Sequence, residues 1–247
     1  MTAPVKVRNR LYDTSPILIH AHGLMKHKPA WPPIREAVFA APARQLAPLE
    51  NLTLITCNNG HEAMGLFERS VERLGLSVQV FGQGIDPWVN ARDKPRVLAE
   101  ALAGLTTEFV LYADSRDAVL LDDPRLAIDR MPPGCEFWLG GDRINWPALP
   151  RFRDFERRLP GAAASEFRYL NGGAWIGRTA FVREFFARAL ETPPLPDAPE
   201  SEQGILKTLF PQYVPAMQLD YRCEVFQNIG FVMTDIFDVE PAGAQAP

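Results

Sequence analysis

The sequence has few cysteines and no long hydrophobic run near its start. Its 247 residues include three cysteines, Cys57, Cys135 and Cys223, which lie in or beside apolar segments without the spacing of metal ligands. We expect buried reduced thiols. The opening segment MTAPVKVRNRLYDTSPIL lacks the apolar stretch of a signal peptide or a transmembrane helix. The sequence therefore predicts a cytoplasmic protein with no membrane span.

The chain also lacks an excess of basic residues. It has 26 Lys and Arg against 30 Asp and Glu, which gives a formal net charge of -4. Nucleic acid is not an expected partner, because a general nucleic-acid-binding protein needs a basic face to displace counterions from phosphates. Hydrophobic residues make up 47% of the chain, enough for a substantial core. We expect one domain over residues 1–240 and a disordered tail over 241–247.

Strand and helix patterns alternate through the middle of the chain. They predict strands at 52–57, 77–82 and 108–113 and helices at 61–75 and 95–105. Pro95 suits the first turn of the second helix. Because these strands are apolar throughout, we expect an α/β fold with a mostly parallel central sheet and helices on both faces. Such sheets bind ligands at the carboxyl ends of their strands.

The rest of the chain is less regular. We expect a strand at 135–141, an amphipathic helix at 179–191, a shorter helix at 202–210, and long connections at 142–170 and 192–200. Connections of that length are typical of lids or binding loops. Residues 29–50 contain five prolines among alanines, a composition that favours a linker with at most one or two helical turns.

Two aspartates, three residues apart, follow the third predicted strand in the segment YADSRDAV. Asp114 stands at the strand's carboxyl end and Asp117 follows it. Two carboxylates held close together repel each other unless a hard divalent cation lies between them, so the pair is a candidate metal site. The alternative is an Asp that caps the next helix and an Asp paired with Arg116 or Arg125.

Two histidines end the apolar segment ILIHAHG near the N-terminus. Alternation along a strand places His20 and His22 on the same face. Histidines at strand ends are more often ordinary hydrogen-bonding residues than metal ligands. If an imidazole joins the two carboxylates, the site suits Mn²⁺ better than Ca²⁺, because calcium prefers an all-oxygen shell.

Further residues are suited to ligand binding, each with an ordinary alternative. Gly172 and Gly173 in RYLNGGAWIG permit close backbone approach to a ligand or a tight turn. Trp146, in a predicted loop, either stacks on a sugar or base or covers a core edge. Lys94 either reaches a phosphate at the strand ends or stays solvated. Glu202 begins a helix, where a carboxylate is favoured with or without a chemical role.

Together these segments resemble the glycosyltransferase domain of the procollagen lysyl hydroxylases and related collagen glycosyltransferases. YADSRDAV is similar to the family's Asp-Ser-x-Asp metal motif, RINWP to its segment with a loop Trp-Pro, and RYLNGGAWIG to Leu-Asn-Ser-Gly-Gly-Phe-Ile-Gly. SEQGILKTLF resembles the segment in which an acidic run and Gln precede a helix, and LDYRCEVFQN resembles Leu-Asp-His-x-x-x-Ile-Phe-Gln-Asn. Five motifs in the family's order cover most of the chain. The resemblance implies a GT-A-like, Rossmann-like fold.

A sixth similarity is out of order. VRNRLYDTSPILIHAHGLMK resembles a segment that follows the Phe-Gln-Asn motif in the family, but here it comes first. The resemblance thus implies a circular permutation, in which 1–28 is the former carboxyl-terminal strand segment, 29–50 a linker and 51–240 the nucleotide-sugar-binding core. A tandem or misassembled gene is the alternative.

The resemblance also implies a function and a set of site residues. The protein would be a metal-dependent glycosyltransferase that moves a hexose from UDP-glucose or UDP-galactose to a hydroxyl acceptor. Mn²⁺ or Mg²⁺ would be held by Asp114, Asp117 and His20, with both aspartates catalytic through the metal. Glu202 is the candidate base for the acceptor's proton. The donor would be bound by Lys94, Trp146, Asn171, Gly172, Gly173, His22 and Lys26.

The sequence departs from the family at three points. His22 replaces an Asn, the acidic run is reduced to Glu200 and Glu202, and Tyr221 replaces a His. The acceptor therefore stays open between a hydroxylysine-like residue, a bacterial glycan and a small molecule. Two other functions remain as alternatives: a metal-dependent phosphohydrolase or nucleotidyltransferase, and a catalytically silent nucleotide-sugar-binding module.

Overall fold

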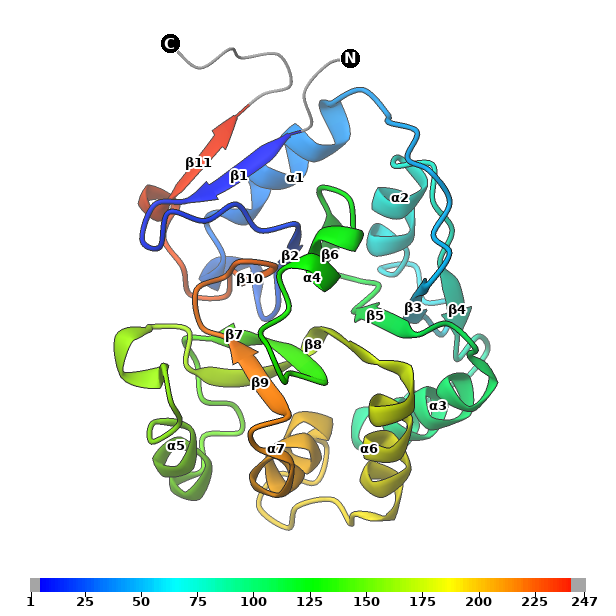
Figure 1. The fold of residues 1–247 in the computed structure, drawn as a ribbon, viewed down its shortest axis with the longest axis vertical. Coiled ribbons are helices and arrows are strands. Elements are labelled where there is room, and N and C mark those ends of the chain that lie inside the picture. Colours follow the sequence, from blue (N-terminus) through cyan, green and yellow to red (C-terminus); the bar gives the residue numbers. More distant parts are fainter. Residues whose placement is uncertain (1–4, 241–247) are drawn as a thin grey trace.

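A six-stranded sheet forms the centre of the computed structural model, which describes residues 5–240 (Figure 1). Its strand order is β4-β3-β5-β8-β7-β9. The strands are β3 (Leu52–Cys57), β4 (Gln79–Phe81), β5 (Phe109–Ala113), β7 (Phe137–Asp142), β8 (Tyr169–Arg178) and β9 (Met217–Asp220). Strand β8 is antiparallel to β5 and β7, and the other neighbours are parallel. The predicted α/β fold with a mostly parallel sheet is confirmed.

Helices cover both faces of this sheet (Figure 1). One face carries α3 (Asn90–Gly104), α5 (Pro150–Glu156), α6 (Thr179–Glu191) and α7 (Glu202–Tyr213), and the other carries α2 (Leu66–Glu72) and α4 (Arg125–Asp129). On the first face Phe185 and Phe186 of α6 pack with Trp175 of β8. On the second, Phe67 of α2 packs with Leu111 of β5. The two apolar layers fix the strand ends between them.

Two small sheets join the beginning of the chain to its end. Strand β2 (Leu18–His20) lies between β10 (Phe226–Asn228), to which it is parallel, and β6 (Ala118–Leu120), to which it is antiparallel. Strand β1 (Lys6–Asn9) pairs antiparallel with β11 (Phe237–Glu240), so that Lys6 lies opposite Glu240. The permutation hypothesis requires this proximity.

The expectation for residues 29–50 was wrong in one respect. Helix α1 (Trp31–Ala40) has ten residues and buries Trp31, Ile34 and Val38. Two of the five prolines that suggested a linker, Pro32 and Pro33, stand in its first turn, where the missing backbone N–H needs no partner inside the helix. Residues 42–49 have no regular secondary structure.

Other element boundaries also differ from the prediction. Helix α3 begins at Asn90, so Pro95 lies inside it rather than in its first turn. The predicted helix at 61–75 is shorter, because Gly65 precedes α2 with a φ of 95°, a left-handed conformation. The long connection at 142–170 contains α5, and RYLNGGAWIG forms strand β8 instead of a turn.

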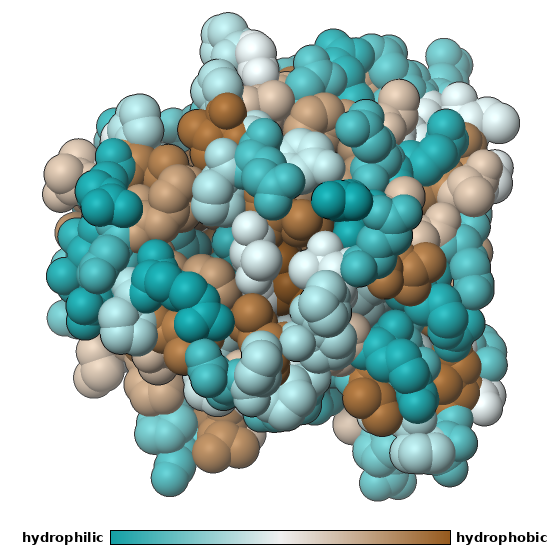
Figure 2. Space-filling model, turned by 90° about the horizontal axis from the view of Figure 1, so that it is seen from below, coloured by the Kyte–Doolittle hydropathy of each residue, from teal (hydrophilic) through white to brown (hydrophobic). Residues whose placement is uncertain are grey.

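The surface, the cysteines and the helices can be compared with what the composition predicts. Figure 2 shows a face on which hydrophilic and hydrophobic residues are mixed, with a hollow near its middle. Cys57, Cys135 and Cys223 are buried free thiols, as expected. None of the helices among the described residues combines the length and apolar character needed to cross a bilayer. The predicted tail at 241–247 lies outside the described residues.

Candidate metal and ligand site

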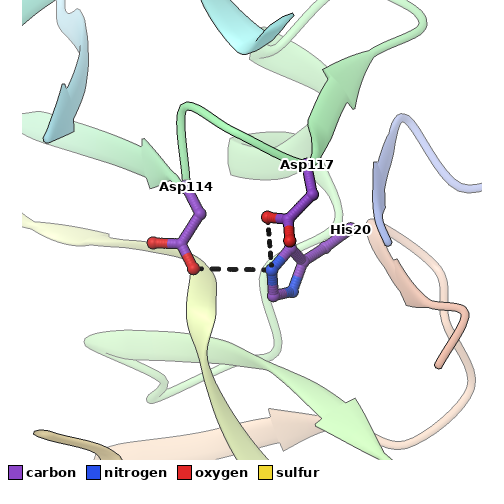
Figure 3. A group of neighbouring side chains, drawn as sticks. All are labelled: His20, Asp114 and Asp117. Atoms are coloured by element: carbon purple, nitrogen blue, oxygen red, sulfur yellow. Dashed lines mark ion pairs between the residues drawn. The ribbon is translucent and has the colours of Figure 1, made fainter. Parts of the chain in front are cut away.

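Three side chains from distant parts of the chain converge at the carboxyl end of β5. Asp114 and Asp117 lie in the connection from β5 to β6, and β2 brings His20 beside them through its pairing with Ala118 (Figure 3). The Nε2 atom of His20 lies 3.4 Å from Asp114 Oδ2 and 3.4 Å from Asp117 Oδ1. One ligand atom from each residue falls within a group no wider than 4.8 Å. The geometry that the resemblance implied for these three residues is present.

Asn228 fixes the orientation of His20 through the Nδ1 side of the imidazole ring. Asn228 donates its amide Nδ2 to the carbonyl of Gly141 at 2.8 Å, so its Oδ1 faces His20. The Nδ1–H of His20 donates to that oxygen at 2.7 Å. The buried Nε2 then makes no well-aligned hydrogen bond within the part of the chain that the structure describes. Metal-binding histidines are oriented in this way, with one ring nitrogen hydrogen-bonded and the other free for the ion.

Two carboxylates lie against the Nε2 atom of His20. Burial lowers the pKa of His20, but the carboxylates of Asp114 and Asp117, each 3.4 Å from Nε2, outweigh it and raise the pKa to about 10. The proton on Nε2 therefore occupies the place where a divalent ion would bind between the same groups. The ordinary alternatives are weaker, because Arg116 lies 3.5 Å from Asp117 and is exposed, and Arg125 pairs with Asp123 instead.

The loop that carries the two aspartates is held by the start of α2. The backbone N–H groups of Leu66 and Phe67 donate to the carbonyl of Ser115 at 2.8 and 3.1 Å. The hydroxyl of Ser115 donates to Glu68 at 2.7 Å. On the other side, the N–H of Asp114 donates to the carbonyl of Gly173 at 2.8 Å. These bonds fix the loop before any ligand is present.

Asp114 also has a buried ammonium neighbour. Lys94 of α3 donates to Asp114 Oδ1 at 2.9 Å, and the hydroxyl of Tyr112 donates to the same oxygen at 2.5 Å. Burial raises the pKa of Asp114, but Lys94 and then His20 outweigh it and hold the pKa below its usual range. Asp114 is therefore ionised, with Oδ1 bound to Lys94 and Oδ2 directed at His20.

Glu202 lies on the far side of Lys94, at the start of α7. Its Oε2 is 3.6 Å from the ammonium, and its buried Oε1 has no hydrogen-bond partner among the described residues. Burial raises the pKa of Glu202 to about 7 against the opposing charge of Lys94. A carboxylate with such a pKa can take up or release a proton near neutral pH.

The two glycines of RYLNGGAWIG leave room for site residues and do not form a turn. A Cβ on Gly172 would lie 3.0 Å from Glu202 Oε1, and one on Gly173 would lie 2.0 Å from Cε1 of His20. Side chains here would therefore displace the residues that form the site. The groups that lie close to the backbone of these two glycines are therefore the side chains of Glu202 and His20.

Two cavities meet at this cluster, and both are lined by Asn90, Lys94, Asp114 and Arg116. The smaller, of about 280 Å³, extends along the ends of β3 and β5. The larger, of about 640 Å³, is lined by six further predicted residues, which are His20, His22, Trp146, Asn171, Gly173 and Glu202. Trp146 is 54% exposed, so it does not fill the core.

Two of the predicted site residues line neither cavity, and other site residues were missed. Lys26 is exposed, whereas Gly172 is buried and meets Glu202 from the protein side. Asp142, at the end of β7, was missed although it follows an apolar strand as Asp114 does. Its Oδ2 lies 3.0 Å from Nε2 of His22 and accepts a hydrogen bond from Asn171 at 2.9 Å. The position of Asp142 at a strand end was a usable signal.

Comparisons with known proteins leave the family undecided. No protein-family model and no curated protein matches the chain. Among solved structures, it is similar to the crystal structure of a glycosyltransferase involved in the glycosylation of the major capsid of PBCV-1. The identity is 13%, the match covers 72% of this chain and 82% of that one, and the TM-score is 0.40. A likeness this weak carries no functional weight, so function has to be inferred from the residues themselves.

Proposed function

We propose that the protein is a metal-dependent glycosyltransferase that moves a hexosyl group from UDP-glucose or UDP-galactose to a hydroxyl acceptor. The observation that carries this proposal is the meeting of His20 with Asp114 and Asp117 at strand ends of a mostly parallel sheet. Ligands of such sheets bind at this edge. The collagen-glycosyltransferase-like motifs of the sequence favour the same three ligands.

The side chains fit a transition-metal ion better than calcium. They offer one imidazole nitrogen whose tautomer leaves it free and two carboxylates, a set suited to Mn²⁺ and acceptable to Mg²⁺. When bound, the ion would act as a Lewis acid toward the donor diphosphate and stabilise negative charge on the departing nucleotide.

The protein's own groups then have separate tasks. Lys94 holds Asp114 in place and adds positive charge where the diphosphate would lie. In its ionised form, Glu202 accepts the proton of the acceptor hydroxyl through its unpartnered oxygen. His22 and Asn171, both bound to Asp142, form part of the wall of the larger cavity.

The two cavities suggest how the substrates divide. The smaller cavity takes the nucleoside, and the larger takes the hexose and the acceptor, so that the diphosphate lies between them beside Asp114. Trp146 would cover the sugar or the acceptor at the mouth of the larger cavity. Trp146→Ala should weaken binding with little loss of stability, whereas a loss of roughly 3 to 5 kcal/mol would indicate a buried structural role.

We also propose that the chain is circularly permuted. Strands β11 and β1 pair like the two arms of a β-hairpin whose connecting turn has been opened, with Glu240 opposite Lys6. In that reading, 1–28 is the former carboxyl-terminal segment, and 29–50 crosses the domain to the core at 51–240.

Calorimetry of UDP binding tests the metal site. We expect wild-type protein to bind UDP more tightly with Mn²⁺ than without it, and Asp114→Asn to lose that difference while it stays folded. Asp154→Asn is a matched control, because Asp154 is exposed on α5, pairs with Arg153 and lines neither cavity. Unchanged metal-dependent affinity in Asp114→Asn would remove the basis of the proposal.

Product analysis separates the alternatives. Release of UDP from UDP-glucose or UDP-galactose with transfer to an added alcohol supports a glycosyltransferase. Turnover of phosphate esters without any sugar acceptor would indicate a phosphohydrolase or nucleotidyltransferase. Metal-dependent UDP binding with neither hydrolysis nor transfer would indicate a silent binding module.

A further inference from the structure

The larger cavity has a polar floor, and its exposed rim, called the mouth here, carries apolar side chains beside the polar residues Asn90, Arg116 and Glu200. His20, Lys94, Asp114 and Glu202 line the floor. Of the ten large hydrophobic side chains that are exposed in the described part of the chain, three line this cavity. These are Leu24 (65% exposed), Trp146 (54%) and Phe231 (46%). Such clustering distinguishes a binding surface from the scattered exposed hydrophobic residues of an ordinary surface.

Phe231 lies at the mouth in an unfavourable backbone conformation. Its φ of 60° is left-handed, which a bulky side chain rarely adopts. Its ring stacks on His27 at a centroid distance of 4.2 Å with 17° between the planes, and its N–H donates to the carbonyl of His27. The preceding Gly230 is required, because a Cβ there would lie 2.3 Å from His22. Strain of this kind concentrates at functional sites.

We propose that the mouth of the larger cavity binds the apolar part of the acceptor, which is an alcohol or glycoside with an aryl or alkyl group beside its reacting hydroxyl. The inference rests on the proposed glycosyl transfer and adds the substrate class. A hydroxyl that reaches Glu202 on the floor has to leave the rest of its molecule at the mouth. An aryl or alkyl group placed there buries apolar surface against Leu24 and Phe231.

A bare sugar fits this mouth less well. Trp146 and Phe231 can stack on a sugar ring, but the aliphatic side chain of Leu24 offers no partner for its hydroxyls. Polar groups that lose water without gaining hydrogen bonds oppose binding. Asn90, Arg116 and Glu200 offer polar partners elsewhere around the opening, so the cavity as a whole matches an amphiphilic acceptor.

Two simple glucosides test the inference. Phenyl and methyl β-D-glucopyranoside are titrated calorimetrically into the protein, with and without UDP and Mn²⁺. We expect the phenyl compound to bind about tenfold more tightly, because its ring buries apolar surface at the mouth. Leu24→Gln and Phe231→Asn should each reduce this preference, and Asn tolerates the left-handed backbone. Leu190→Gln is the control, because Leu190 is 52% exposed on α6 and lines neither cavity.

Several outcomes would overturn the inference: equal affinity for the two glucosides, no binding of either, or an equal loss of preference in Leu190→Gln. If Leu24→Gln instead converts a dimer to a monomer in sedimentation, the mouth is an interface between copies of the chain. UDP titrations of the same samples keep the two proposals apart. Metal-dependent UDP binding without a phenyl preference contradicts the acceptor class alone, whereas absence of UDP binding contradicts the glycosyltransferase itself.

Discussion

Gly173→Ala isolates the role of His20 without changing any charged residue. The added Cβ would lie 2.0 Å from Cε1 of His20, 2.6 Å from Nε2 and 2.7 Å from Nδ1. Ordinary contact begins near 3.4 Å, so the ring has to move by about 1.4 Å. Gly173 has no left-handed φ, and therefore Ala adds a steric effect without backbone strain at that residue. The variant displaces a proposed ligand and leaves both aspartates in place.

The expected loss of Mn²⁺ affinity is large. A misplacement of about 1 Å can cost a site a factor of about 100, and disturbance of the groups that orient a metal ligand costs about 10 to 100-fold. We therefore expect Mn²⁺ to bind about 100-fold more weakly, which corresponds to about 2.7 kcal/mol. Crowding of β8 should also cost about 1 to 3 kcal/mol of stability, so binding is measured by calorimetry well below the melting temperature.

Two further variants make the test decisive. Gly104→Ala is the matched control, because a Cβ at the end of α3 meets nothing within 4 Å. In His20→Ala the space is empty, so adding Gly173→Ala should cost no further Mn²⁺ affinity. Wild-type Mn²⁺ affinity in both Gly173→Ala and His20→Ala would show that His20 is not a ligand. Full additivity in the double variant would show that Gly173→Ala does not act through His20.

Three other predictions address protons and chain order. Binding of Mn²⁺ near pH 8 should release about one proton, because His20 has a pKa of about 10 without metal. Calorimetry in buffers of different ionisation enthalpy measures this release, and its absence would show that the site is misassigned. The pKa of Glu202 is raised to about 7, so the stability of the wild type falls as pH rises from about 4.5 to 7. In urea unfolding without metal, Glu202→Gln should therefore gain up to about 3 kcal/mol over wild type by pH 8. A difference that stays constant with pH would contradict this. A chain in which a short turn joins Glu240 to Val5 and new termini open within 41–51 should fold and bind UDP, and failure to fold would count against the permutation.

The central strands and the helix at 179–191 were predictable because one physical pattern dominates each of them. Strands β3 and β5 are apolar on both faces, and the amphipathic stripe of α6 gives its bounds without error. Helix α1 was not predictable in the same way. Prolines usually interrupt a helix, and the start of α1 at Trp31, which places its prolines in the first turn, is known only from the structure. Strand β8 was hidden because its glycines resemble a turn until the residues packed against them are known.

Some residues of the site were predictable from local sequence, and others were not. Asp114 and Asp117 were identifiable from local sequence, but nothing local brings His20 to them, and only the resemblance suggested it. Tyr112 completes the cluster from inside an apolar strand, and Asn228 from the end of the short strand Phe-Gln-Asn, where neither residue has a distinguishing pattern. Their roles depend on pairings between strands that are remote in sequence, which a linear pattern does not contain.

The position of β2 in the middle of its sheet has a consequence for synthesis of the protein. His20 and the Asn228 that orients it are separated by 208 residues, so the ribosome makes this strand long before its parallel neighbour β10 exists. Contacts of such high sequence separation form late and slowly. A nascent or truncated molecule without β10 would hold both aspartates and yet leave the imidazole unoriented. Metal affinity would then report whether a molecule has been made to its last strands.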